Sequence, residues 1–189
     1  MTKSILLVGV GGQGTILASK LLTTGLMEAG YDVKMSEIHG MSQRGGSVSS
    51  QVRYGEKVYS PVIELGGADI LVSFEKMEAL RWLEYLKPNG KVIVNNYEIS
   101  SMPILSGKAD YSKEIINELS SKVQTKVVDA AKHAEELGNS KVMNVILLGA
   151  TVKAMGLEEI NWENIIRDNV KPQFLELNLK AFEIGKGLA

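Results

Sequence analysis

The sequence predicts an α/β fold, in which a doubly wound, mostly parallel sheet carries an inserted antiparallel hairpin and a helical C-terminal end. Three observations predict it. Short apolar runs alternate with helical patterns over the first 128 residues, a glycine-rich turn follows the first run, and the pattern after residue 130 is almost entirely helical. Alternation of this kind is typical of strands that lie parallel, with helices covering the sheet.

The first unit runs from residue 5 to residue 37. Residues 5–8 are continuously apolar, as in strands buried on both faces. After the glycine turn, apolar residues recur every three or four positions over residues 14–29, which predicts a helix that ends at Gly30. Gly25 inside that helix indicates close packing against a strand. Residues 31–37 then form the second strand, and the whole unit is Rossmann-like.

The middle of the chain predicts the inserted hairpin. Two short strands, 47–54 and 57–63, flank Gly55-Glu56, a pair suited to a type II′ turn. Residues 70–74 form a further buried strand. A helix over 75–86 is expected to end at Pro88-Asn89-Gly90, before a central strand at 92–94.

The last third is mostly helical. Residues 97–110 are loop-like, and residues 125–128 form a short strand. Helices are predicted over 111–122, 130–137, 140–155, 162–169 and 173–186. We expect one domain over residues 1–189.

Composition excludes several classes of site. The chain has no cysteine and two histidines, so disulfides, thiolate metal sites, iron–sulfur ligation and a multi-histidine metal site are not expected. The net charge of −1 gives no general attraction to nucleic acid or to anionic membranes. The short apolar run near the start does not fit a signal peptide, and no run fits a membrane span. A soluble cytoplasmic protein is therefore expected.

The glycine turn is the first candidate site. Gly9, Gly11 and Gly14 fit the spacing G-x-G-x-x-G between a strand and a helix, where free backbone N–H groups favour a phosphate. The alternative is purely architectural, with glycines that permit tight packing. Glu37 is placed to hold ribose hydroxyls in a dinucleotide enzyme, but a polar residue that opens the next loop is the favoured interpretation.

The loop over residues 39–46 is the second candidate site. Arg44 beside Gln43 and a Gly-Gly pair could bind a phosphate or carboxylate, and His39 could act as an acid or base. Contact with another subunit explains the same loop equally well.

Three further polar residues have ordinary explanations. Glu75 and Glu78 complement the dipole of a helix at its start. Asn144 is either a buried hydrogen-bonding residue or a polar group at a helix contact. No residue is assigned as catalytic, and no metal site is assigned.

These motifs resemble a known family. The turn from Gly9 to Gly14 resembles that of the γ-type subunits of 2-oxoacid:ferredoxin oxidoreductases. The stretch 37–48, Glu-Ile-His-Gly-Met-Ser-Gln-Arg-Gly-Gly-Ser-Val, is similar to the β subunits of the indolepyruvate ferredoxin oxidoreductases. Residues 68–72 with the two following glutamates, 144–150 and 178–182 continue the resemblance over the chain.

The resemblance implies a small subunit of an enzyme that converts arylpyruvates to acyl-CoA and CO₂ and passes electrons to ferredoxin. Thiamine diphosphate, Mg and iron–sulfur clusters would belong to a larger α subunit, and coenzyme A is a possible ligand of this chain. The residues carried over as candidate cofactor-binding positions are Gly9, Gly11, Gly12, Gln13, Gly14, His39, Ser42, Gln43, Arg44, Gly45 and Gly46. Two alternatives stay open, a stand-alone NAD(P)- or FAD-binding protein and a purely structural partner subunit.

Overall fold

The computed structural model describes residues 2–40 and 45–189, and its centre is a six-stranded mixed sheet. The strand order is β2-β3-β1-β4-β5-β6. The strands are β1 (Lys3–Val10), β2 (Asp32–His39), β3 (Ser47–Gly55), β4 (Ala68–Ser73), β5 (Leu86–Asn95) and β6 (Gln124–Val128). β1, β4, β5 and β6 are parallel, as the sequence predicts for most of the sheet.

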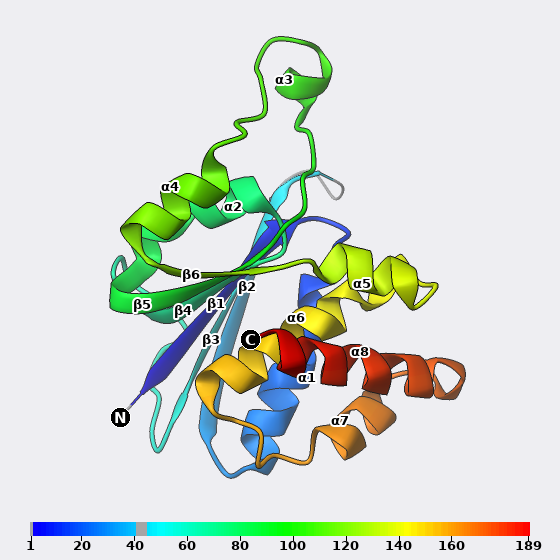
Figure 1. Cartoon of the computed structure of the whole chain (residues 1–189). Helices are drawn as coiled ribbons and strands as arrows, with labels where there is room; N and C mark the ends of the chain where they lie inside the picture. The colour runs from blue at the N-terminus through cyan, green and yellow to red at the C-terminus, as the bar shows by residue number, and fades with distance from the viewer. Residues whose placement is uncertain (1, 41–44) are drawn as a thin grey trace.

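Helices cover both faces of the sheet (Figure 1). They are α1 (Thr15–Glu28), α2 (Lys76–Arg81), α3 (Met102–Leu105), α4 (Ile115–Lys122), α5 (Ala130–Glu136), α6 (Met143–Met155), α7 (Trp162–Asn169) and α8 (Leu175–Leu188). Ile5 and Leu7 of β1 face the core beneath α1, α6 and α8, whereas Leu6 and Val8 face the core beneath α2 and α4. Alternate residues of β1 thus enter two cores, which explains its continuously apolar sequence.

The antiparallel part of the sheet differs from the predicted hairpin. β3 lies between β1 and β2 and is antiparallel to both, so the hairpin is formed by β2 and β3. The predicted strand at 57–63 is wrong, because both edges of β3 are already paired. Side chains of β3 instead form hydrogen bonds to the backbone of that segment. Arg53 donates to the carbonyl oxygens of Ser60 and Val62, and Gln51 accepts from the Ile63 amide.

The predicted helix over 75–86 is too long. α2 ends at Arg81, a 3₁₀ turn covers Leu83–Tyr85, and β5 begins at Leu86, before Pro88. The register of β5 against β4 shifts between Ala68 and Ile70, at this irregular start of β5. The residues from Leu86 to Gly90 therefore enter the sheet instead of extending or terminating a helix.

The C-terminal helices match the prediction closely. α7 has the predicted bounds, and α6 ends at Met155 with Gly156 as its cap, whose φ of 66° is the left-handed conformation that favours glycine. Gly25 of α1 packs against the Trp162 ring of α7, so the predicted contact with a strand is wrong. None of the helices in the described part of the chain is long and apolar enough to cross a lipid bilayer.

Candidate functional site

The glycine turn lies at the carboxyl end of β1, at the point where the chain enters α1. Gly12 and Gly14 have φ of 101° and 81°, a conformation that side-chain-bearing residues rarely adopt. A Cβ at Gly9 would lie 3.0 Å from the Cβ of Phe74 and 2.9 Å from Oε1 of Gln13. The glycines are therefore needed for the shape of the turn and for its close approach to the end of β4.

Gln13 locks this turn onto the sheet. Its side chain is 8% exposed. Oε1 accepts a hydrogen bond from the Val10 amide at 2.7 Å, and Nε2 donates to the Phe74 carbonyl at 2.8 Å. Both ends of the amide therefore have partners inside the protein, and Gln13 holds the turn in position.

We expect Gln13→Glu to lower the free energy of unfolding by about 2 kcal/mol, because a carboxylate oxygen would face the Phe74 carbonyl without a proton between them. Thermal or urea denaturation measures this. The exposed Gln173 is the matched control, and Gln173→Glu should change stability by less than about 0.5 kcal/mol. Equal stability of the two variants would contradict the role assigned to Gln13.

The structure brings the two predicted motifs together. The Gly11 amide donates to the Gly46 carbonyl at 2.9 Å, so the turn and the C-terminal end of the loop are joined directly. The Gly40 amide donates to the Ser47 carbonyl at 3.0 Å and closes the base of the loop. Gly45 is exposed, with φ of 82°. Ser42, Gln43 and Arg44 lie outside the described residues.

Glu37 lies on β2, away from the glycine turn. The Glu37 carboxylate accepts from the Ser19 hydroxyl at 2.8 Å and lies 3.8 Å from Nε2 of His39. β3 separates β2 from β1, so Glu37 lies two strand spacings, roughly 10 Å, from the strand that carries the turn. The favoured interpretation of Glu37 as a polar residue before the loop agrees with this placement.

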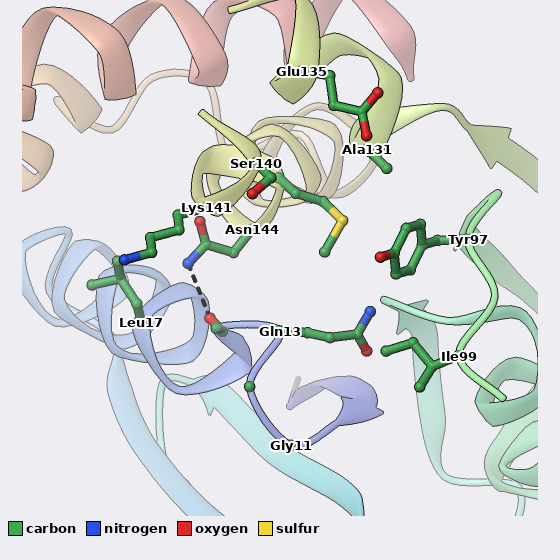
Figure 2. Close-up of a pocket in the computed structure, with 13 residues that line it drawn as sticks. Gly11, Gln13, Leu17, Tyr97, Ile99, Ala131, Glu135, Ser140, Lys141 and Asn144 are labelled. Carbon is green, nitrogen blue, oxygen red and sulfur yellow. Dashed lines mark hydrogen bonds between the residues drawn. The ribbon is translucent and has the colours of Figure 1, made fainter. Parts of the chain in front are cut away.

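A cavity of about 580 Å³ opens on the other side of the turn. This volume falls within the range of small-molecule sites. Four segments line it, namely the turn with the first part of α1, the chain after β5, helix α5, and the 3₁₀ turn Ser140–Val142 with the start of α6 that follows it (Figure 2). The residues are Gly11, Gly12, Gln13, Gly14, Leu17, Tyr97, Ile99, Ala131, Glu135, Ser140, Lys141, Met143 and Asn144.

Asn144 links the turn to α6. The side chain is 5% exposed, and its Nδ2 donates to the Gly14 carbonyl at 3.2 Å, as Figure 2 shows. The prediction of a buried hydrogen-bonding residue is confirmed. Among the described residues, Asn144 Oδ1 is buried without a hydrogen-bond partner, and Asn144 is one of the residues that line the cavity. A buried acceptor of this kind is satisfied when a donor reaches it.

The electrostatics of the cavity favour an anion at the turn. In the described part of the chain, no side chain caps the start of α1 and its first turn has no acidic residue. The helix dipole and the first amides therefore present partial positive charge there. Lys141 and Glu135 add one charge of each sign to the wall.

Glu75 has a larger role than the helix dipole predicts. The carboxylate is 1% exposed and accepts from the Glu78 amide at 2.9 Å, as a residue capping α2 does. It also accepts hydrogen bonds from the Tyr111 hydroxyl and, at 3.2 Å, from the Ile99 amide. Burial, followed by the hydrogen bond to this carboxylate, raises the pKa of Tyr111 above its ordinary value, so the phenol stays a donor.

Glu78 holds the end of the 39–46 loop. Its carboxylate, 4% exposed, accepts from the hydroxyl of Ser47, the residue that follows the loop, and from Nε1 of Trp82 at 3.3 Å. Arg81 donates to the other oxygen at 3.1 Å. Burial and long-range partners carry no local sequence signal, which is why the dipole explanation missed this role.

The site offers binding groups in several chemical classes. Backbone amides and Lys141 suit an anion, Asn144 Oδ1 suits a donor, and Tyr97 and Ile99 provide apolar surface. Within residues 2–40 and 45–189, no three histidine, aspartate or glutamate side chains gather as metal ligands would. The arrangement fits a mixed polar and apolar ligand with an anionic part.

Comparison with known proteins supplies related sequences over nearly the whole chain. The sequence pattern of the family described as pyruvate ferredoxin/flavodoxin oxidoreductase matches residues 4–188. Indolepyruvate oxidoreductase subunit IorB of Thermococcus kodakarensis is 41% identical over 96% of this chain and 93% of that protein. The protein of the same name from Pyrococcus horikoshii is 40% identical over the same shares. The 2-oxoglutarate synthase subunit KorC of Methanothermobacter thermautotrophicus is 30% identical over 98% of this chain and 94% of that protein.

Solved structures share the fold. The γ subunit of a keto/oxoacid ferredoxin oxidoreductase from Geobacter sulfurreducens superposes with a TM-score of 0.74 at 23% identity, over 100% of this chain and 96% of that chain. A 2-oxoglutarate:ferredoxin oxidoreductase from Magnetococcus marinus, solved with 2-oxoglutarate, coenzyme A and succinyl-CoA bound, gives 0.80 at 21% identity. The superposition covers 100% of this chain and 31% of that chain, so the fold is one part of a longer polypeptide there.

Proposed function

Because the chain belongs to the pyruvate ferredoxin/flavodoxin oxidoreductase family, we propose that it is the small subunit of a cytoplasmic indolepyruvate ferredoxin oxidoreductase. The complex would decarboxylate an arylpyruvate, transfer the acyl group to coenzyme A, release CO₂ and pass two electrons to ferredoxin.

Sequence similarity is the observation that carries the substrate class. Identity is 40–41% to the two relatives named for indolepyruvate and 30% to the relative named for 2-oxoglutarate, over similar shares of the chain. The relatives are all named as subunits, which implies a partner chain. Arylpyruvates are therefore the substrates to test first.

The work would be divided between the two subunits. Thiamine diphosphate, bound with Mg, supplies the carbanion chemistry of decarboxylation, and iron–sulfur clusters carry the electrons. We assign these groups to the larger subunit, since this chain has no cysteine to ligate a cluster. This chain would complete the site at which coenzyme A meets the acyl group.

Coenzyme A fits the cavity at the glycine turn. Its phosphates would lie at the start of α1, against the first amides of that helix and near Lys141. Its pantetheine amides and hydroxyl are donors of the kind that Asn144 Oδ1 lacks. The loop that carries Arg44 is joined to the same turn through Gly11 and Gly46, so its guanidinium is a second candidate for a phosphate.

We expect Arg44→Ala to raise the KM for coenzyme A about tenfold in the assembled complex, because one charge-assisted contact to a phosphate would be lost. Steady-state ferredoxin reduction with a saturating arylpyruvate measures this. Arg167→Ala is the control, since Arg167 pairs with Glu163 on the exposed side of α7. An unchanged KM and kcat for Arg44→Ala would favour a loop that serves subunit contact alone.

A further inference from the structure

A long excursion leaves the carboxyl end of the sheet between β5 and α4. We call residues 97–111 the arm. Figure 1 shows that it stands away from the sheet and carries the short helix α3 at its tip. Met102 and Leu105 of α3 are 74% and 69% exposed. Because residues three apart lie on one side of a helical turn, these two apolar side chains share one side of the tip.

The base of the arm is held firmly. Glu75 accepts hydrogen bonds from Tyr111 at one end of the arm and from the Ile99 amide near the other. The Lys76 amide donates to the Tyr97 carbonyl at 3.0 Å, and the Lys76 ammonium lies 5.9 Å from the centre of the Tyr111 ring. The start of α2 thus fixes both ends of the arm, while the tip extends into solvent.

The arm also borders the candidate cofactor cavity. Tyr97 and Ile99, at its base, line the cavity on the side opposite Lys141 in Figure 2. The base of the arm is therefore part of the cavity wall, and the apolar pair Met102 and Leu105 lies beyond it, at the tip.

Single exposed apolar residues are common on protein surfaces and do not by themselves indicate an interface. The segment 57–67 exposes Tyr59 (90%) and Leu65 (62%) at the opposite end of the sheet, where the parallel strands begin. The arm differs from it in two respects. Its apolar tip projects from a base that is tied to the sheet, and that base forms a wall of the proposed coenzyme A site.

We propose that the arm is a docking element for the larger subunit, which takes Met102 and Leu105 into an apolar surface. The inference rests on the proposed function. Two observations favour this occupant. The relatives are named as subunits of oxidoreductases, and in the Magnetococcus protein this fold is 31% of one longer chain. Methionine and leucine suit such a contact, since both adapt to an apolar pocket.

The test compares two double variants in assembly with the larger subunit, purified from the native complex and titrated with each form of this chain. Met102→Ser/Leu105→Ser removes the apolar tip, and Tyr59→Ser/Leu65→Ser removes equally exposed residues at the other edge. We expect the arm variant to raise the Kd of assembly at least about tenfold, as loss of an interface anchor does, and the control to stay within about twofold. Circular dichroism of each free chain should be unchanged, because the four side chains are exposed.

Tyr111→Phe is a second variant that keeps the apolar tip and removes only the hydroxyl bonded to Glu75. A looser arm should weaken assembly about threefold. If wild-type chain and larger subunit assemble and all three variants assemble equally well, the docking inference is overturned while the proposed function stands. If the wild-type chain does not assemble with the larger subunit, the proposed function itself fails.

Discussion

Gly185→Ala is expected to lower the melting temperature of the chain by roughly 6–12 °C, which corresponds to about 3 kcal/mol for a protein of this size. Gly185 lies in α8 where that helix crosses α6. A Cβ at this position would overlap the Ile146 carbonyl oxygen and lie 3.1 Å from the Ala150 amide. Gly149 of α6 makes the reciprocal approach to the backbone of α8. Because backbone cannot move aside as a side chain can, the two helices must separate.

The matched control is Gly187→Ala, two residues along the same helix. Gly187 is exposed, and a Cβ there would meet nothing within 4 Å. Alanine is the better helix former, so this variant should be neutral or about 0.5–1 kcal/mol more stable. Thermal denaturation followed by circular dichroism measures both. If the two variants melt together, the contact between α6 and α8 is not as close as described.

Gly14→Ala is expected to raise the KM for coenzyme A by at least about tenfold in the assembled complex. Two effects act together. A residue with a side chain at φ of 81° is strained by about 1–2 kcal/mol, and its Cβ would overlap Nδ2 of Asn144. Relief of that overlap moves either the turn or Asn144, and both belong to the proposed site. The start of α1 would then no longer present its amides to a phosphate in the same geometry.

Gly30→Ala is the control variant, because it introduces backbone strain of the same kind away from the proposed site. Gly30 follows the other end of α1 with a similar φ of 86°, and a Cβ there would meet nothing within 4 Å. It should cost about as much stability from strain but leave the KM for coenzyme A unchanged, as steady-state ferredoxin reduction would show. Equal KM values for the two variants would contradict a coenzyme A site at the turn.

The local signals in the sequence predict much of this fold. The apolar run before Gly9, the glycine that begins α1 and the Gly156 that ends α6 each act within a few residues of the feature they determine. The pairing of β3 with β1 and β2 depends on which edges are free after the whole sheet has assembled. Residues 57–63 contain β-branched and aromatic residues suited to a strand, yet no edge of β3 remains for them.

The candidate site likewise has parts that local sequence predicts and parts that depend on the assembled fold. The sequence predicts the glycine turn and the 39–46 loop from their motifs, and the Gly11–Gly46 hydrogen bond joins the turn to the end of the loop. The hydrogen bond between Asn144 and Gly14 joins residues that are 130 positions apart in the sequence, and the one between Tyr111 and Glu75 joins residues 36 positions apart. Contacts over such separations are made by tertiary packing, so neighbouring residues give no sign of them. The arm carries no periodic pattern at all, and its projection is a property of the assembled fold.

Reconstitution from separated subunits tests whether this chain is a required small subunit of the enzyme. The larger subunit, freed of this chain, is assayed for coenzyme A-dependent ferredoxin reduction with indolepyruvate before and after this chain is added back. We expect no activity from this chain alone, little from the larger subunit alone, and full activity when the two are recombined in equal amounts. Decarboxylation by this chain alone, or full activity of the larger subunit without it, would show that this chain is not a required small subunit of the enzyme.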